Sequence, residues 1–73
     1  MKPTTENIGA LARETRKALG ATQADLALTS GTGLRFISEL EKGKSTCQIG
    51  KVLTVLQTLG IQIEFIKPNS MKG

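Results

Sequence analysis

The stretch TQADLALTSGTGLRFISELEKGK, residues 22–44, decides the fold of this 73-residue chain. It predicts two short helices joined by a tight turn. Leu26 faces inward on the first of them, and Ile37 with Leu40 gives the second an apolar face. Gly31 lies between the helices, where such a turn needs a residue that accepts a positive φ.

Capping residues and glycines extend this pair to four helices. Thr22 and Asp25 have the spacing of a capping box at the start of the second helix. The first helix is expected to begin near residues 5–7, with Thr5 or Asn7 as its cap, and the third to run from about 33 to 42. Thr46 is expected to cap the fourth helix. The glycines that end the first, third and fourth helices are Gly20, Gly43 and Gly60.

The first and fourth helices each show an apolar face at helical spacing. In the first helix the expected inward residues are Ile8, Leu11, Ala12, Thr15 and Leu19. In the fourth they are Ile49, Val52, Leu53, Leu56 and Leu59.

After residue 60 the hydrophobic period changes to two. Ile61, Ile63 and Phe65 alternate with polar residues, which predicts a β-strand that Pro68 stops. A lone strand leaves its backbone groups unpaired, and the sequence offers no second strand. We therefore expect this strand to pair with its counterpart in a second copy, with those three residues making the dimer contact.

Composition excludes several classes of protein. With one cysteine and no histidine, the chain has neither a disulfide nor an expected zinc site, and no other metal or cofactor site is predicted. Two phenylalanines are the only aromatic residues, too few for a platform that stacks single-stranded bases. Nothing resembles a catalytic cluster, so no enzyme is expected. There is no apolar run of membrane length, and residues 1–7 lack an apolar signal region, so a cytoplasmic protein is expected.

The charge balance favours an anionic partner. Ten Lys and Arg residues against six Asp and Glu give a formal net charge of +4. Arg35 begins the third helix, and Lys42 and Lys44 flank the glycine that ends it. A basic helix that follows a tight turn suits insertion into the major groove of DNA.

At this point the chain resembles a known family. Residues 7–60 resemble the lambda-repressor-like, Cro/C1-type (XRE) helix-turn-helix domains. The residues that carry the resemblance are Gln23, Leu26, Ala27, Gly31, Ile37 and Leu40, with the Gly20 to Gln23 start and the Glu39 to Lys44 end. The strand directly after the fourth helix makes the chain most similar to HipB-like antitoxins within that family.

The resemblance implies a mainly α fold, a four-helix helix-turn-helix domain with a C-terminal strand that pairs across a homodimer. The expected parts are a flexible N-terminus (1–5), the DNA-binding domain (6–60), a dimerisation strand (61–67) and a flexible tail (68–73). It also implies a repressor of a pseudo-palindromic operator in double-stranded DNA that binds a HipA-like kinase toxin and represses their shared operon. The alternatives are a protein-interaction subunit whose DNA binding is secondary and a stand-alone phage-type or restriction-control repressor. The operator sequence and the identity of any toxin are not given by the sequence.

The candidate DNA-binding residues lie at the start of the second helix, in the turn, and along the third helix to just beyond its end. They are Thr22, Gln23, Thr32, Gly33, Leu34, Arg35, Ser38, Glu39, Lys42 and Lys44.

Several of these candidates have more than one possible role. Arg35 is the candidate for a bidentate contact to guanine, with a phosphate contact or plain solvation as alternatives. Leu34 either touches a thymine methyl group or packs within the domain. Glu39 either accepts a hydrogen bond from cytosine or acts as an ion-pair partner and repels phosphate. Lys42 and Lys44 are expected at phosphates or simply in solvent.

Other positions concern the framework. The resemblance implies that Glu41 pairs with an arginine of the first helix, for which Arg16 is our choice. Cys47 is expected as a small core residue that starts the fourth helix, with a redox switch as the alternative. Ser30 and Thr32 replace the aliphatic residues that usually brace the turn, which predicts a looser turn in which Thr32 takes the capping role.

Overall fold

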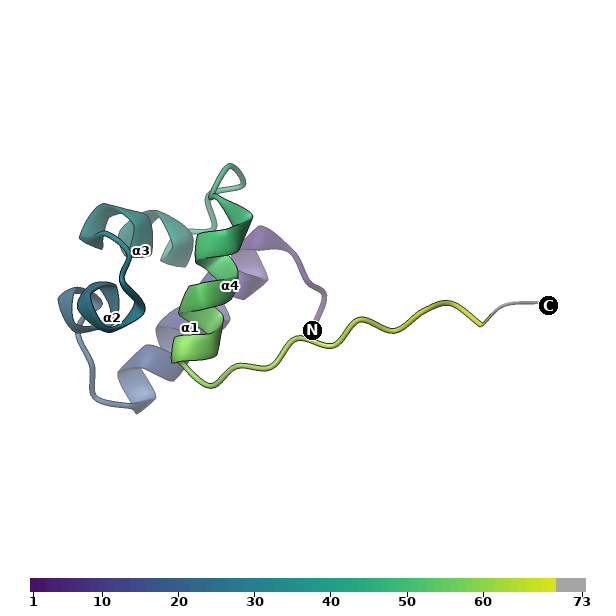
Figure 1. Ribbon diagram of the computed structural model, residues 1–73, viewed down its shortest axis with the longest axis horizontal. Helices are drawn as coiled ribbons and strands as arrows, with labels where there is room; N and C mark the ends of the chain where they lie inside the picture. Colours follow the sequence, from purple (N-terminus) through teal and green to yellow (C-terminus); the bar gives the residue numbers. More distant parts are fainter. Residues whose placement is uncertain (70–73) are drawn as a thin grey trace.

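Four helices account for most of residues 1–69, the part of the chain that the computed structural model describes. They are α1 (Thr5–Ala18), α2 (Gln23–Ser30), α3 (Leu34–Glu41) and α4 (Ile49–Thr58). Helix α3 packs against both α1 and α2, and α4 packs against α2 (Figure 1). The mainly α, four-helix prediction is confirmed for this part of the chain. None of the helices in it has the length and hydropathy needed to cross a membrane.

Side chains cap the starts of α1 and α2. The backbone N–H of Asn7 donates to Oγ1 of Thr4, which is therefore the cap of α1. The predicted caps were Thr5 or Asn7, so the observed cap lies one residue before Thr5. Thr22 and Asp25 form the predicted capping box, with reciprocal bonds of 2.9 and 3.0 Å. The residues at the start of α2 themselves determine where the helix begins, so the sequence predicted this start correctly.

Helix α4 begins later than predicted. Gln48 is its N-cap, and its Oε1 accepts a 2.7 Å hydrogen bond from the N–H of Lys51. Thr46 lies in the preceding turn, so the prediction that it caps the helix is wrong. Cys47 precedes the cap and does not start the helix, but it is half-buried against the core as a small core residue would be.

The core lies where the four helices meet. Most predicted inward residues are buried, among them Ala12, Leu26, Ile37, Leu40 and Leu56. The remaining buried apolar residues are Ala27, Val52, Val55 and Leu59.

Helix α4 is rotated relative to the prediction. Val55 is fully buried, whereas Ile49 is 67% exposed and Leu53 is 36% exposed. Apolar residues lie on two faces of this helix, so periodicity alone does not decide which face turns inward. Leu19 is also exposed, because it is the C-cap of α1 and has left the inward face of that helix.

The segment after α4 is extended and leads away from the helices (Figure 1). The N–H of Ile61 donates to the Leu56 carbonyl at 2.9 Å, which fixes the start of the segment. Phe65 and Ile66 are more than four-fifths exposed. The predicted β-strand is absent from residues 1–69 of this single chain, because a β-ladder needs a second strand with which to exchange hydrogen bonds. Of the predicted tail, residues 70–73 lie outside the described part.

Gly9 allows α1 to approach the end of α3 closely. It is buried, and a Cβ atom built on it would overlap the Leu40 carbonyl oxygen and lie 3.0 Å from the Glu41 oxygen. The sequence alone does not reveal this position, since one glycine inside a helix carries no signal of what packs against it.

Gly9→Ala should therefore lower the free energy of unfolding by about 1–3 kcal/mol, the usual cost of overpacking a tight contact. Backbone atoms of α3 provide the obstacle, so no side chain can rotate away. Gly50→Ala in α4 is the matched control: the new Cβ would meet only the Gln48 side chain, 3.0 Å from the Oε1 that caps α4, and the gain of roughly 1 kcal/mol in helix propensity should offset a small shift of that cap. Urea titration should show the loss in the first variant and no loss in the second. Equal midpoints would mean that α1 and α3 separate at little cost.

Candidate nucleic-acid interface

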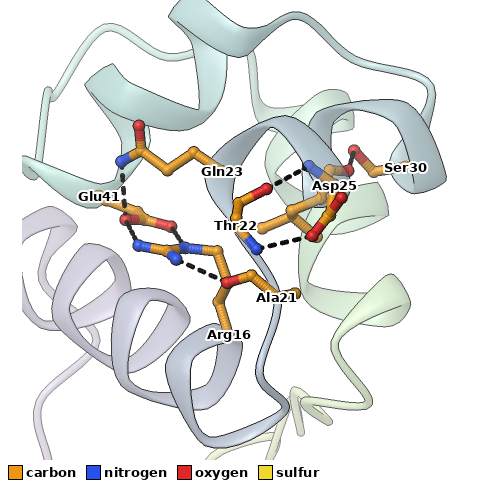
Figure 2. A network of polar contacts seen from close by, with 8 residues as sticks. Arg16, Ala21, Thr22, Gln23, Asp25, Ser30 and Glu41 are labelled. Carbon is orange, nitrogen blue, oxygen red and sulfur yellow. Dashed lines mark hydrogen bonds and ion pairs between the residues drawn. The ribbon is translucent and has the colours of Figure 1, made fainter.

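A buried polar network holds α1, α2 and α3 together behind the candidate surface. Arg16 donates from Nε to Oε2 of Glu41 at 2.7 Å and from Nη2 to Oε1 at 2.9 Å. Gln23 donates from Nε2 to the same Oε1 at 3.0 Å, and Nη1 of Arg16 donates to the Ala21 carbonyl at 2.8 Å (Figure 2). The predicted pairing of Glu41 with Arg16 is confirmed, and each of the three helices contributes one member.

The network compensates the cost of burying two charges. The side chains of Arg16 and Glu41 are only 9% and 2% exposed. Burial alone would raise the pKa of Glu41, but hydrogen bonds from Arg16 and Gln23 and the arginine's charge outweigh it, so the pKa lies below its ordinary value. The bond to Glu41 in turn raises the pKa of Arg16 despite its desolvation. Both groups are therefore ionised at neutral pH, and α3 is anchored at its C-terminal end.

Hydroxyl groups brace the turn between α2 and α3. Ser30 is buried, and its Oγ donates to the Leu26 carbonyl at 2.7 Å and lies 2.8 Å from Oγ1 of Thr32. Gly31 has a φ of 70°, as the turn prediction required. These contacts replace the aliphatic ones that the family resemblance implied, so the turn is held by hydrogen bonds.

Gly33, and not Thr32, is the N-cap of α3. Its φ of −104° and ψ of 155° are extended, and no side chain caps the helix within the described residues. The prediction that Thr32 caps α3 is wrong, because its hydroxyl is turned toward Ser30.

Some of the candidate DNA-binding residues make hydrogen bonds within the domain, and others are exposed or half-buried. Thr22, Gln23 and Thr32 take part in the capping box, the buried network and the turn. Leu34 is 54% exposed, so it does not pack into the core, and the side chain of Arg35 is 90% exposed. The other exposed candidates are Gly33, Lys42 and Lys44, whereas Ser38 and Glu39 are half-buried.

Glu39 makes ion pairs with two of these cations. Its Oε2 lies 3.4 Å from Nε of Arg35 and 3.2 Å from Nζ of Lys44. The hydrogen bond from Lys44 is the largest of the effects that hold the pKa of Glu39 below its ordinary value. Glu39 is therefore an ion-pair partner in the free chain, and its roles toward cytosine and phosphate stay predictions.

The first turn of α3 thus presents an arginine and a leucine to solvent, followed by two lysines around the helix end. Such a surface offers hydrogen-bond donors and positive charge to an anionic polymer. Within residues 1–69 no three His, Cys, Asp or Glu side chains lie where they would hold a metal ion.

A second surface lies between α4 and the extended segment. A cleft of about 510 Å³, which we call the terminal cleft, is lined mainly by apolar side chains from the N-terminal residues, α1, α4 and residues 61–65. Among them are Ile49, Leu53, Ile61, Ile63 and Phe65. All three dimerisation candidates therefore share one surface with the exposed face of α4.

Known proteins resemble this chain in sequence and in fold. The helix-turn-helix family model HTH_3 matches residues 13–66. An uncharacterized HTH-type transcriptional regulator, y4mF of Sinorhizobium fredii, is 52% identical over 69 residues, which are 94% of this chain and 91% of that protein. Among solved structures, a HipB variant in complex with an O2 20mer has a TM-score of 0.81 at 20% identity, covering 94% of this chain and 96% of that one. A structure called MDT Protein has a TM-score of 0.81 at 19% identity, covering 94% and 97% of the two chains. The two structural likenesses establish the four-helix fold.

Proposed function

Because the chain belongs to the Cro/C1-type helix-turn-helix family, we propose that it is a sequence-specific, DNA-binding transcriptional repressor. The family is a DNA-binding one and not a family of enzymes. The observation that carries the proposal is the exposed start of α3, with Arg35 in its first turn, on a helix whose far end is anchored by the buried Arg16–Glu41 pair. A rigid helix with a free basic end can enter a major groove without first being ordered.

In this proposal α3 lies in the major groove. The Arg35 guanidinium donates to O6 and N7 of a guanine, and Leu34 contacts a thymine methyl group. Lys42 and Lys44 meet phosphates on either side of the helix end. Gln23, at the start of α2, meets a phosphate with the amide hydrogen that it does not give to Glu41, and Thr22, Thr32, Gly33 and Ser38 complete the contact surface.

Selection of duplexes from random DNA, followed by footprinting on the region upstream of the gene, tests this function. We expect one enriched sequence that also occurs upstream and that the protein protects. Binding that is equal for every sequence would overturn the proposal of a specific repressor.

Arg35→Ala should weaken binding to the enriched duplex by about 1–3 kcal/mol and relax the preference at one base pair of each half-site. The reason is the loss of a bidentate contact to a base edge. Lys44→Ala is the matched control, because it removes one positive charge from beyond the first turn of α3. It should weaken binding to all duplexes alike and reduce the salt slope by about one. An unchanged preferred sequence in the Arg35 variant would reduce that residue to a phosphate contact.

We propose further that the repressor is a homodimer. In each subunit residues 61–66 would pair antiparallel with the same residues of the partner subunit and cover the terminal cleft. The support is the apolar surface that a single chain leaves open there, with Ile49 67% and Phe65 88% exposed. A two-fold axis would select a pseudo-palindromic operator, with half-sites about 34 Å apart or a multiple of that spacing.

The antitoxin role is the finer part of the proposal. The support is the fold shared with HipB and Ile66, which is 84% exposed and alternates away from Ile61, Ile63 and Phe65. After strand pairing, Ile66 would remain available to a HipA-like kinase toxin. Co-expression with the neighbouring genes and purification of the complex is the test. Strong operator binding with no partner at all would favour a stand-alone repressor, and a complex without operator binding would favour an interaction subunit.

A further inference from the structure

The Glu39 side chain contacts both Arg35 and Lys44. In the proposed function Arg35 contacts a base and Lys44 contacts a phosphate. Arg35 belongs to the first turn of α3, whereas Lys44 follows the glycine that ends the helix. One carboxylate oxygen of Glu39 lies within 3.4 Å of a nitrogen of each. The Glu39 side chain is 29% exposed, so neighbouring residues cover part of it.

The contact with Arg35 uses only one edge of the guanidinium. Glu39 accepts from Nε, and no residue in the described part of the chain engages Nη1 or Nη2. Those two nitrogens are therefore free to donate. Arginine has a fixed fork of donors, so a 3.4 Å contact through Nε favours orientations in which the two free nitrogens point away from Glu39.

The same carboxylate opposes contact with phosphates. It is a negative charge on a surface that is otherwise basic; it is ionised at neutral pH, and the hydrogen bond from Lys44 lowers its pKa further. Any duplex that approaches α3 brings phosphate charges toward this carboxylate. Only a duplex with a guanine opposite Arg35 offers that arginine a bidentate hydrogen bond that offsets the repulsion.

We infer that Glu39 is a positioning residue that sets specificity: it orients Arg35 toward a guanine and repels DNA that offers only phosphates. This inference rests on the proposed DNA-binding function and extends it to a residue that need not touch a base. It differs from direct readout, in which Glu39 would accept a hydrogen bond from cytosine.

The test compares wild type with Glu39→Gln and with Glu14→Gln as the matched control. Glu14 is exposed on α1 two residues from Arg16, about 200° around the helix, so it lies away from the side that meets α3. Both variants lose one negative charge. The probes are a random-sequence duplex and the duplex that wild type enriches most strongly, each titrated at several salt concentrations.

For Glu39→Gln we expect binding to the random duplex to tighten by about 3- to 10-fold and its salt slope to steepen by about 0.9, the value of one further phosphate contact. The enriched duplex is relieved of the same repulsion but loses the orientation of Arg35 toward its guanine, so its net gain should be close to zero and the specificity ratio falls by the same factor. Glu14→Gln should leave that ratio unchanged. In an Arg35→Ala background, Glu39→Gln should still tighten random binding but leave base preference unaltered.

An unchanged specificity ratio in Glu39→Gln would overturn the inference. So would the loss of a cytosine preference without tighter random binding, since that outcome is direct readout. A wild-type chain that prefers no sequence would overturn the proposed function itself, and the inference with it.

Discussion

Glu41→Ala should lower the free energy of unfolding by about 3–5 kcal/mol, the cost of leaving a buried charge without its partner. Arg16, whose side chain is 9% exposed in the wild type, would keep only its bond to the Ala21 carbonyl. Gln23 would lose its acceptor on α3 at the same time. A domain of this size is stable by only roughly 4–11 kcal/mol, so the variant should lose a large part of its stability.

Urea denaturation followed by circular dichroism measures this effect. The matched control is Glu64→Ala, which removes an exposed carboxylate from the extended segment and should change stability by less than about 0.5 kcal/mol. Replacing both Arg16 and Glu41 with leucine should recover part of the loss, because no buried charge then remains. A loss below about 1 kcal/mol in Glu41→Ala would show that solvent reaches Arg16 freely, against its burial here.

The pH dependence of the same difference identifies the carboxylate as its source. The folded state holds the pKa of Glu41 below its ordinary value of 4.5, so its contribution is complete above that pH. The contribution is lost as the pH falls through the lowered pKa. The gap between wild type and Glu41→Ala should therefore be constant at neutral pH and shrink under acid.

Sequence reasoning succeeded where nearby residues determine the structure. Thr22 and Asp25 are three positions apart and satisfy each other, and Gly31 is the residue that the turn's positive φ favours. The pairing of Glu41 with Arg16 spans 25 positions, and only the family resemblance indicated it.

It failed where the outcome depends on what packs against a residue. Val55 and Leu53 both continue a helical apolar pattern, and the rotation of α4 buries the first and exposes the second. Ser30 looked like a departure from an apolar turn, yet it is buried because its hydroxyl finds a carbonyl one helical turn back. A strand at residues 61–66 cannot be completed by one chain, since its hydrogen-bond partners belong to a second copy in the proposed dimer.

Phe65→Glu should abolish the proposed dimer while leaving the four-helix domain folded. In the single chain Phe65 is 88% exposed, so its replacement removes little packing within the subunit. In the dimer each phenylalanine would be buried in a terminal cleft, and burying one contributes about 1.5–3 kcal/mol. Two of them contribute about 3–6 kcal/mol, so the dissociation constant should rise by about two to four orders of magnitude, before any cost of burying the new charges.

Analytical ultracentrifugation at micromolar concentration should therefore find a monomer, and operator binding should fall because the two half-sites are no longer held by linked domains. Gln62→Glu is the matched control: it adds the same charge to the polar side of the segment, three residues from Phe65, and should leave a dimer. Unchanged helical circular dichroism in both variants would separate loss of the dimer from loss of the fold. A stable Phe65→Glu dimer with normal operator affinity would place the interface elsewhere and remove the main structural support for the antitoxin reading over a stand-alone repressor.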